Sequence, residues 1–126
     1  MKIQILGKIN CGFPAPGYDT KEESLDFNEL LFKRKSSTYC LRAYGRSMEP
    51  LIFVNDILVV DRSLRPVNND LVIAEIDGMF TAKRILIKSD KVILKPENPE
   101  FSPIEVKEEL NIFGIITAIV RQLRRN

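Results

Sequence analysis

The dipeptide Asp77-Gly78 is the feature that most constrains the fold, because it stands between two runs of strand-forming residues, 71–76 and 79–87. An Asp-Gly pair in this position is the strongest short-range signal for a hairpin with a two-residue turn. A turn of that length fixes which residues of the two strands face each other. The predicted pairs on one side of the hairpin are Ile76 with Met79, Ala74 with Thr81, and Val72 with Lys83.

Lys83 is out of pattern on that side of the hairpin. The side is otherwise almost entirely apolar, and its members are Val72, Ala74, Ile76, Met79, Thr81, Lys83, Ile85 and Ile87. The neighbouring Arg84 falls on the opposite side, with Glu75 and Phe80. Desolvation lowers the pKa of a lysine toward the range in which its amine accepts a proton, so Lys83 is a candidate general base. The structural alternative is a lysine whose stem covers apolar neighbours while its ammonium reaches water at a sheet edge.

The rest of the chain after residue 36 also predicts β structure. Short strands are expected at residues 39–43, 57–61, 91–95 and 112–120, separated by turn-like segments rather than helices. This spacing is typical of an antiparallel, mainly β domain. One short helix is expected before these strands, because Asp26 stands three residues before Glu29 as in a capping box.

The N-terminal segment predicts a flexible arm. Residues 10–24 show no sustained periodicity and are interrupted by Gly12, Pro14, Pro16 and Gly17. The remaining chain is long enough, and apolar enough, to bury one core. We therefore expect an arm of residues 1–24 and a single folded domain of residues 25–126.

Composition excludes several kinds of catalytic site. The chain has no histidine, and its only cysteines are Cys11 and Cys40, so Ser-His-Asp catalysis, Cys-His catalysis and a typical zinc site are excluded. No metal and no cofactor are expected. Two cysteines do not make a disulfide framework, which favours a reducing compartment, and no segment predicts a signal peptide or a membrane span. We therefore expect a soluble, cytoplasmic protein that does not bind membranes.

The charge of the chain does not indicate a nucleic-acid-binding protein. The formal net charge is +2, and the only basic cluster is Arg121, Arg124 and Arg125. No aromatic residues are interleaved with these arginines, so we interpret them as a solvated tail without a role.

The stretch 45–50, Gly-Arg-Ser-Met-Glu-Pro, predicts a sharply turned, exposed serine between two apolar runs. Gly45 tolerates unusual backbone angles, and Pro50 fits the first turn of a short helix. Ser47 would then stand at a helix N-terminus, where the backbone N–H groups of Ser47 and Met48 can stabilise an oxyanion. The plainer interpretation is a serine-capped turn between two strands.

Ser47 and Lys83 together indicate a serine–lysine pair, because a neutral lysine amine can activate a serine without any histidine. From Cys11 onward the sequence resembles the LexA/UmuD family of serine–lysine autopeptidases. The blocks that carry the resemblance are Cys11-Gly12-Phe13-Pro14, Tyr44-Gly45-Arg46-Ser47-Met48, residues 55–61, residues 77–84, residues 94–104 and Phe113-Gly114. Several blocks in the same order are more specific than any single motif.

The resemblance implies a LexA-like peptidase domain of short antiparallel strands. Ser47 would be the nucleophile, Lys83 the general base, and the N–H groups of Ser47 and Met48 the oxyanion hole. The bond between Cys11 and Gly12 would be the substrate, with Cys11 as a specificity residue. Only ten residues precede Cys11, which leaves no room for the helix-turn-helix domain of the repressors, so sequence-specific DNA binding is not expected.

The function that the resemblance implies is a self-cleaving regulatory subunit of a translesion DNA polymerase in the SOS response. The implied partners are a second copy of the chain in a homodimer, the RecA filament on single-stranded DNA, which stimulates cleavage, and a UmuC-type translesion polymerase. Two departures from the family are the short leader before Cys11 and Arg46, at a position that is often acidic or small.

Two other functions remain open at this point. A signal-peptidase-like processing enzyme is similar around Ser47 and Lys83, although the missing membrane anchor speaks against it. A catalytically silent dimerisation module is the other alternative, although the presence of both residues speaks against that.

Overall fold

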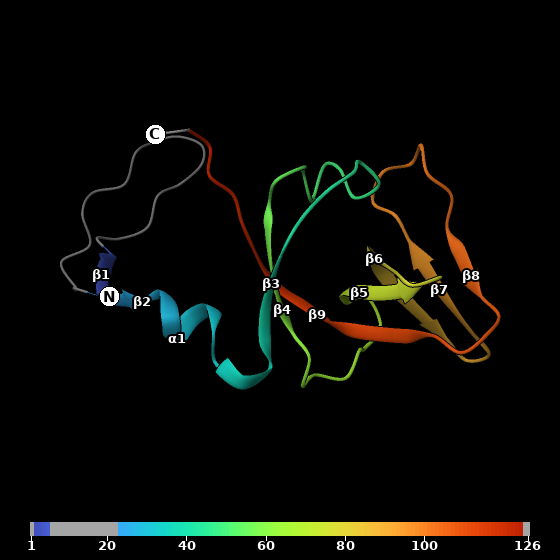
Figure 1. Ribbon diagram of the computed structural model, residues 1–126, viewed down its shortest axis with the longest axis horizontal. Coiled ribbons are helices and arrows are strands. Elements are labelled where there is room, and N and C mark those ends of the chain that lie inside the picture. Colours follow the sequence, from blue (N-terminus) through green and yellow to red (C-terminus); the bar gives the residue numbers. More distant parts are fainter. Residues whose placement is uncertain (1, 6–22, 125–126) are drawn as a thin grey trace, which may run out of the picture. The chain divides into compact units, whose positions relative to one another are not determined.

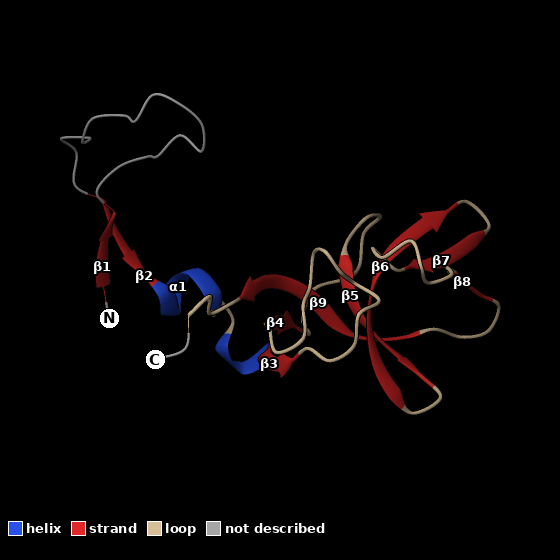
Figure 2. Cartoon of the chain, turned by 90° about the horizontal axis from the view of Figure 1, so that it is seen from above, coloured by secondary structure: helices blue, strands red, loops and turns tan. Residues whose placement is uncertain are grey.

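The computed structural model describes residues 2–5 and 23–124, and the chain divides into two compact units, Met1–Lys33 and Arg34–Asn126. The described residues form nine strands with antiparallel pairing, one short α-helix and one turn of 3₁₀-helix. The helical segments, blue in Figure 2, precede the first strand of the larger sheet. The predicted mainly β fold is therefore confirmed. No helix in the described part of the chain is long and apolar enough to cross a membrane.

The first unit contains a two-stranded sheet and helix α1. Strand β1 (Lys2–Ile5) pairs with β2 (Glu23–Asp26), and α1 (Phe27–Leu31) follows directly. Asp26 is the N-cap, as the sequence predicted, and its side chain accepts a hydrogen bond from the N–H of Asn28 at 2.9 Å. Strand β1 and the start of β2 fall in the segment that we expected to be an arm. The rest of that segment lies outside the described residues, so the division into arm and domain stays a prediction.

The second unit is built on a seven-stranded sheet with the order β3-β4-β9-β5-β6-β7-β8 (Figure 1). The strands are β3 (Thr38–Arg42), β4 (Ile57–Asp61), β5 (Leu71–Ile76), β6 (Met79–Lys88), β7 (Lys91–Lys95), β8 (Ile104–Val106) and β9 (Asn111–Val120), and the 3₁₀ turn η1 (Lys35–Ser37) leads into β3. The long strand β9 lies between β4 and β5 (Figure 1). It therefore joins the pair β3–β4 to the group β5–β8.

The β5–β6 hairpin has the predicted register. The observed pairs include Ile76 with Met79, Ala74 with Thr81, and Val72 with Lys83. Asp77 and Gly78 have φ angles of 51° and 77°, as a two-residue turn of this kind requires. The predicted apolar side is buried only in its middle, because Met79 and Ile87 at its two ends are exposed.

Strand β9 approaches β4 very closely at Gly114. The register of β9 shifts against β4 between Val59 and Val60, and against β5 between Ile73 and Ala74. Such bulges bend a strand and increase its local twist. A Cβ added at Gly114 would stand only 2.6 Å from Cγ1 of Val60, so the two strands meet here without room for a side chain.

Two clusters of buried apolar side chains form the core. One cluster comprises Met48, Ile52, Leu58, Val60, Ile73 and Ile116, and the other Val72, Ala74, Ile85, Leu94 and Ile115. The first cluster anchors the turn after Ser47 through Met48, whereas the second contains the buried residues on the Lys83 side of the hairpin. Burial therefore fixes both segments that carry the candidate catalytic residues.

Asp61, at the end of β4, is a buried carboxylate with several fixed partners. Ser63 donates to it through its hydroxyl and its N–H, at 2.7 and 2.8 Å, and the Ser37 hydroxyl donates at 3.0 Å. Arg34 pairs with it at 3.1 Å. These hydrogen bonds, with that of the Ser63 hydroxyl the largest, outweigh desolvation and lower the pKa of Asp61 to about 2.

The second buried carboxylate, Asp56, shows that the interpretation of Arg121 as part of a solvated tail is wrong. Arg121 donates two hydrogen bonds to Asp56, at 2.7 and 2.6 Å, and a third to the carbonyl of Leu51 at 3.1 Å. Its guanidinium also lies over the ring of Phe53. The hydrogen bond from Arg121 lowers the pKa of Asp56. Arg121 therefore ties the end of β9 to the segment that follows the Ser47 turn.

Candidate active site

Ser47 lies in a tight turn between β3 and β4. Gly45 has a φ angle of 91°, a conformation that glycine adopts without strain, as the sequence predicted. Residues 46–52 form hydrogen-bonded turns, one of them closed by the N–H of Ile52 and the carbonyl of Met48 at 2.9 Å. The predicted helix is therefore wrong. Pro50 has no N–H with which to continue a helical ladder at this point.

The structure brings Lys83 to Ser47. The side chain of Lys83 rises from β6, and its Nζ lies 3.1 Å from Oγ of Ser47. The same nitrogen lies 2.7 Å from Oγ1 of Thr81 and 3.1 Å from the carbonyl oxygen of Ala82. Lys83 is only 7% exposed, and β6 is an inner strand of the sheet. The alternative of an ammonium that reaches water at a sheet edge is therefore wrong.

The surroundings of Nζ suit a lysine that changes its protonation state. Burial lowers the pKa of Lys83 from its ordinary value of 10.5. An ammonium donates hydrogen bonds to all three oxygens, whereas a neutral amine donates to Thr81 and Ala82 and accepts from the Ser47 hydroxyl. In the neutral state the lone pair therefore points at the proton that a general base would remove.

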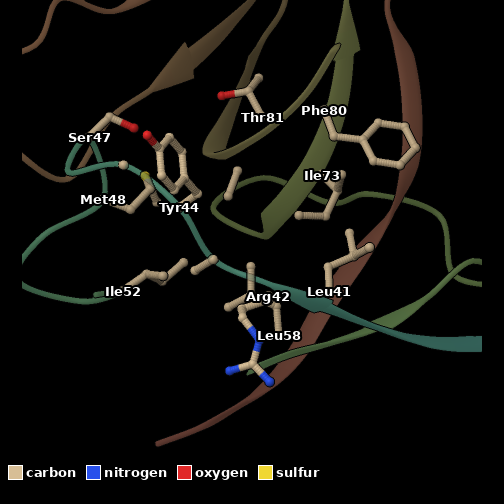
Figure 3. Close-up of a pocket in the computed structure, with 13 residues that line it drawn as sticks. Leu41, Arg42, Tyr44, Ser47, Met48, Ile52, Leu58, Ile73, Phe80 and Thr81 are labelled. Carbon is tan, nitrogen blue, oxygen red and sulfur yellow. The ribbon is translucent and has the colours of Figure 1, made fainter. Parts of the chain in front are cut away.

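A cavity of about 200 Å³ opens beside Ser47. In Figure 3, Ser47 and Thr81 lie along one part of its wall, and the apolar side chains of Leu41, Ile73 and Phe80 lie along another. Lys83 is not one of the lining residues, so its amine contacts the serine without occupying the cavity. The cavity can therefore receive an apolar segment of chain next to the serine hydroxyl.

The backbone N–H groups of Ser47 and Met48 donate no hydrogen bond to any acceptor in the described ranges 2–5 and 23–124. Two such groups beside a nucleophile are what an oxyanion hole requires. The assignment of this role to them stays a prediction.

Two polar residues at the site were not predicted. The predicted register put Thr81 on the same side of the hairpin as Lys83, two residues before it. That spacing is a signal from which the contact between Thr81 and the amine could have been predicted. Asn98 donates from Nδ2 to the carbonyl of Arg46 at 3.0 Å, and from its N–H to the carbonyl of Ser47 at 3.0 Å. No local pattern indicates a contact between segments so distant in the sequence.

The remaining predicted site residues are not placed by the structure. Cys11 and Gly12 lie outside the described residues, whereas Cys40 is an exposed thiol on β3. Among the described residues, no group of three or more His, Cys, Asp or Glu side chains is arranged to hold a metal ion.

Comparison with known proteins identifies a family. The peptidase S24-like family matches residues 4–117. SamA from Salmonella typhimurium is 42% identical over 115 residues, which cover 90% of this chain and 81% of SamA. ImpA from Escherichia coli is 41% identical over 93% of this chain and 81% of its own length, and MucA from Escherichia coli is 36% identical over 89% and 79%.

These relatives are homologues of UmuD, so the resemblance found in the sequence is confirmed. The family match spans most of the chain, including both Ser47 and Lys83. The chain therefore belongs to the peptidase S24-like family and is a serine peptidase of the LexA/UmuD type.

Proposed function

We propose that this protein is a self-cleaving regulatory subunit of a translesion DNA polymerase, and that it cuts its own Cys11–Gly12 bond. As a UmuD-type member of its family it is an SOS-response regulatory protein. The observation that carries the proposal is the 3.1 Å approach of Lys83 Nζ to Ser47 Oγ beside a cavity. A buried, neutral amine in hydrogen-bond contact with a serine is the arrangement that activates the hydroxyl.

The first step forms a bond between Ser47 Oγ and the carbonyl carbon of Cys11. Lys83 takes the hydroxyl proton, and the N–H groups of Ser47 and Met48 hold the oxyanion. Collapse of this intermediate breaks the bond to the nitrogen of Gly12, which receives the proton from Lys83. The products of this half-reaction are an ester between Cys11 and Ser47 and a free amino group on Gly12.

The second step hydrolyses the ester. Lys83, again neutral, takes a proton from a water molecule that attacks the ester carbonyl, and the proton returns to Ser47 as its oxygen leaves. Thirty-five positions separate Gly12 from Ser47. A chain of that length can span more than about 100 Å, so Ser47 can reach the Cys11–Gly12 bond either of its own chain or of the partner chain in a dimer.

The proposed partners follow from the same family membership. We expect a homodimer in the cytoplasm, stimulation of cleavage by the RecA filament on single-stranded DNA, and binding to a UmuC-type polymerase. A partner that stabilises the cleavage-competent conformation accelerates the reaction without supplying a catalytic group. Light scattering should give a dimeric mass at micromolar concentration, and a monomer would contradict the assembly.

Intact-mass spectrometry tests the cleavage. Incubation at mildly alkaline pH should yield fragments 1–11 and 12–126, faster as pH rises and faster with added RecA filament, because high pH favours the neutral amine. Cys11→Ala should still be cut, since its side chain only has to fit a small site.

Matched variants test the assigned roles. Ser47→Ala and Lys83→Ala should abolish the cut, whereas Ser36→Ala and Lys95→Ala, at exposed positions, should leave it unchanged. Lys83→Ala should remain folded by circular dichroism, because alanine suits the apolar surface around it. Cleavage at another bond, or undiminished cleavage of Ser47→Ala, would refute the mechanism.

A further inference from the structure

The loop between β7 and β8 contacts the turn that carries Ser47 and the strand that carries Lys83. Two adjacent residues of this loop, Glu97 and Asn98, reach different elements. Asn98 bonds to the turn that carries Ser47, and Glu97 forms an ion pair with Arg84, the neighbour of Lys83 on β6. Neither Glu97 nor Asn98 takes part in the proposed proton transfers.

Asn98 is buried, with 7% exposure, and its polar groups are directed at the backbone. Its Nδ2 donates to the carbonyl of Arg46 at 3.0 Å, and its own N–H donates to the carbonyl of Ser47 at 3.0 Å. Its Oδ1 accepts from the N–H of Glu100 at 3.0 Å, which holds the amide in this orientation. Asn98 therefore fixes two successive carbonyl groups of the serine turn.

Those two carbonyls belong to the same peptide units as the two candidate oxyanion donors. The carbonyl of Arg46 shares a planar peptide with the N–H of Ser47, and the carbonyl of Ser47 shares one with the N–H of Met48. Both peptides are trans, so each N–H points away from its carbonyl. A hydrogen bond that fixes the carbonyl thereby fixes the direction of the N–H on the opposite edge.

We infer that Asn98 is a positioning residue that aims the N–H groups of Ser47 and Met48 at the oxyanion. This inference rests on the proposed function, because it assigns these groups to the same reaction. The ion pair between Glu97 and Arg84 holds the loop to the strand of the base, so one loop sets the donors relative to Lys83. Two further ion pairs hold the turn at Arg46, one with Glu49 at 3.5 Å and one with Glu100 at 3.9 Å.

The test compares Asn98→Ala and Asn98→Asp with the wild-type chain. Asn98→Asp keeps the shape and the acceptor for the N–H of Glu100 but loses the donor to Arg46. Asn111→Ala is the matched control, because its amide also donates one hydrogen bond, to Glu75 at 2.9 Å, outside the serine turn. Each protein is assayed for self-cleavage across pH, for labelling of Ser47 by a fluorophosphonate, and for folding by circular dichroism.

We expect the plateau rate of cleavage and the labelling rate to fall roughly 10- to 100-fold in folded Asn98→Ala and Asn98→Asp, since misplaced groups lose rates of this size. The midpoint of the pH profile of Asn98→Ala should stay where it is, because the contacts of Lys83 are unchanged. If Asn98 were needed only for folding, a folded Asn98 variant would keep the wild-type rates of cleavage and of labelling. Asn111→Ala should match the wild type.

The outcomes separate this inference from the proposed function. Wild-type protein that is labelled at Ser47 but never cut would refute the proposed function alone, and the labelling of the Asn98 variants would still test the inference. Undiminished labelling and cleavage in folded Asn98→Ala would overturn the inference. Loss of the fold in both Asn98 variants would overturn it too, because Asn98 would then be structural.

Discussion

Replacement of Gly114 by alanine should destabilise the second unit, because β4 and β9 leave no space for a Cβ. The added atom would lie 2.6 Å from Cγ1 of Val60 and 3.1 Å from the carbonyl oxygen of Asp61. Val60 is fully buried and β-branched, so its methyl group cannot rotate away freely. An ordinary contact begins near 3.4 Å, which means that the strands must separate by about 0.8 Å.

Overpacking of this kind in a filled core costs about 1–3 kcal/mol. Any loss of stability in Gly114→Ala would be informative, because a protein with glycine in a strand is otherwise about 0.5–1 kcal/mol less stable than the same protein with alanine. In a domain of about 60–100 residues, 1 kcal/mol shifts the melting temperature by roughly 4–8 °C. With the gain of alanine over glycine subtracted, an intermediate net cost of about 1 kcal/mol remains, so we expect Gly114→Ala to lower the melting temperature by roughly 4–8 °C.

A double-mutant cycle identifies the contact responsible. In a Val60→Ala background the obstructing methyl group is gone, so Gly114→Ala should cost at least about 0.5 kcal/mol less than in the wild type, the lower end of couplings between touching residues. Val59→Ala, at the next position of β4, is the control, and there the cost of Gly114→Ala should be unchanged. Urea unfolding measures the cost of Gly114→Ala in all three backgrounds. Equal costs in the wild-type and Val60→Ala backgrounds, or a Gly114→Ala variant as stable as the wild type, would refute the reasoning.

Three further predictions concern charged and polar contacts. Thr81→Val should lower the plateau rate of self-cleavage roughly 3- to 10-fold and move the pH midpoint down, because the Lys83 ammonium loses an acceptor and its pKa falls further; a midpoint that rises would contradict this. Lys83→Ala should be more stable than the wild type at neutral pH. This difference in stability should shrink toward pH 10.5, because the wild-type amine loses its proton as pH rises. Urea unfolding at two pH values measures the difference. Arg121→Ala should be less stable than the wild type because Asp56 keeps a buried charge without its partner, whereas Arg124→Ala should unfold like the wild type.

Local sequence chemistry was sufficient to predict the hairpin and the misplaced lysine. Asp77 and Gly78 determine the turn, the turn determines the register, and the register places Lys83 on an apolar surface. Each of these steps depends on residues that are near one another in the sequence. Strand β8 was not predicted, since three residues carry too little periodicity to be recognised.

The contacts that the sequence did not predict join distant segments. Ser47 was correctly placed in a turn, but Asn98, which bonds to that turn, lies 51 positions later. Arg121 reads as part of a basic tail in isolation, and only the fold reveals that β9 carries it to Asp56. Neither partner has a local pattern that identifies it, so the sequence cannot predict these contacts.

The central position of β9 has a consequence for how the peptidase is made. The strands before it deliver Ser47 on the β3–β4 side of the sheet and Lys83 on the β5–β6 side, and β9 pairs with both β4 and β5. Because β9 is the last of these strands to be translated, a nascent chain on the ribosome lacks the strand that joins the two sides. We therefore expect ribosome-bound chains that end before residue 111 to remain uncut, so that synthesis itself delays self-cleavage until the whole sheet can close.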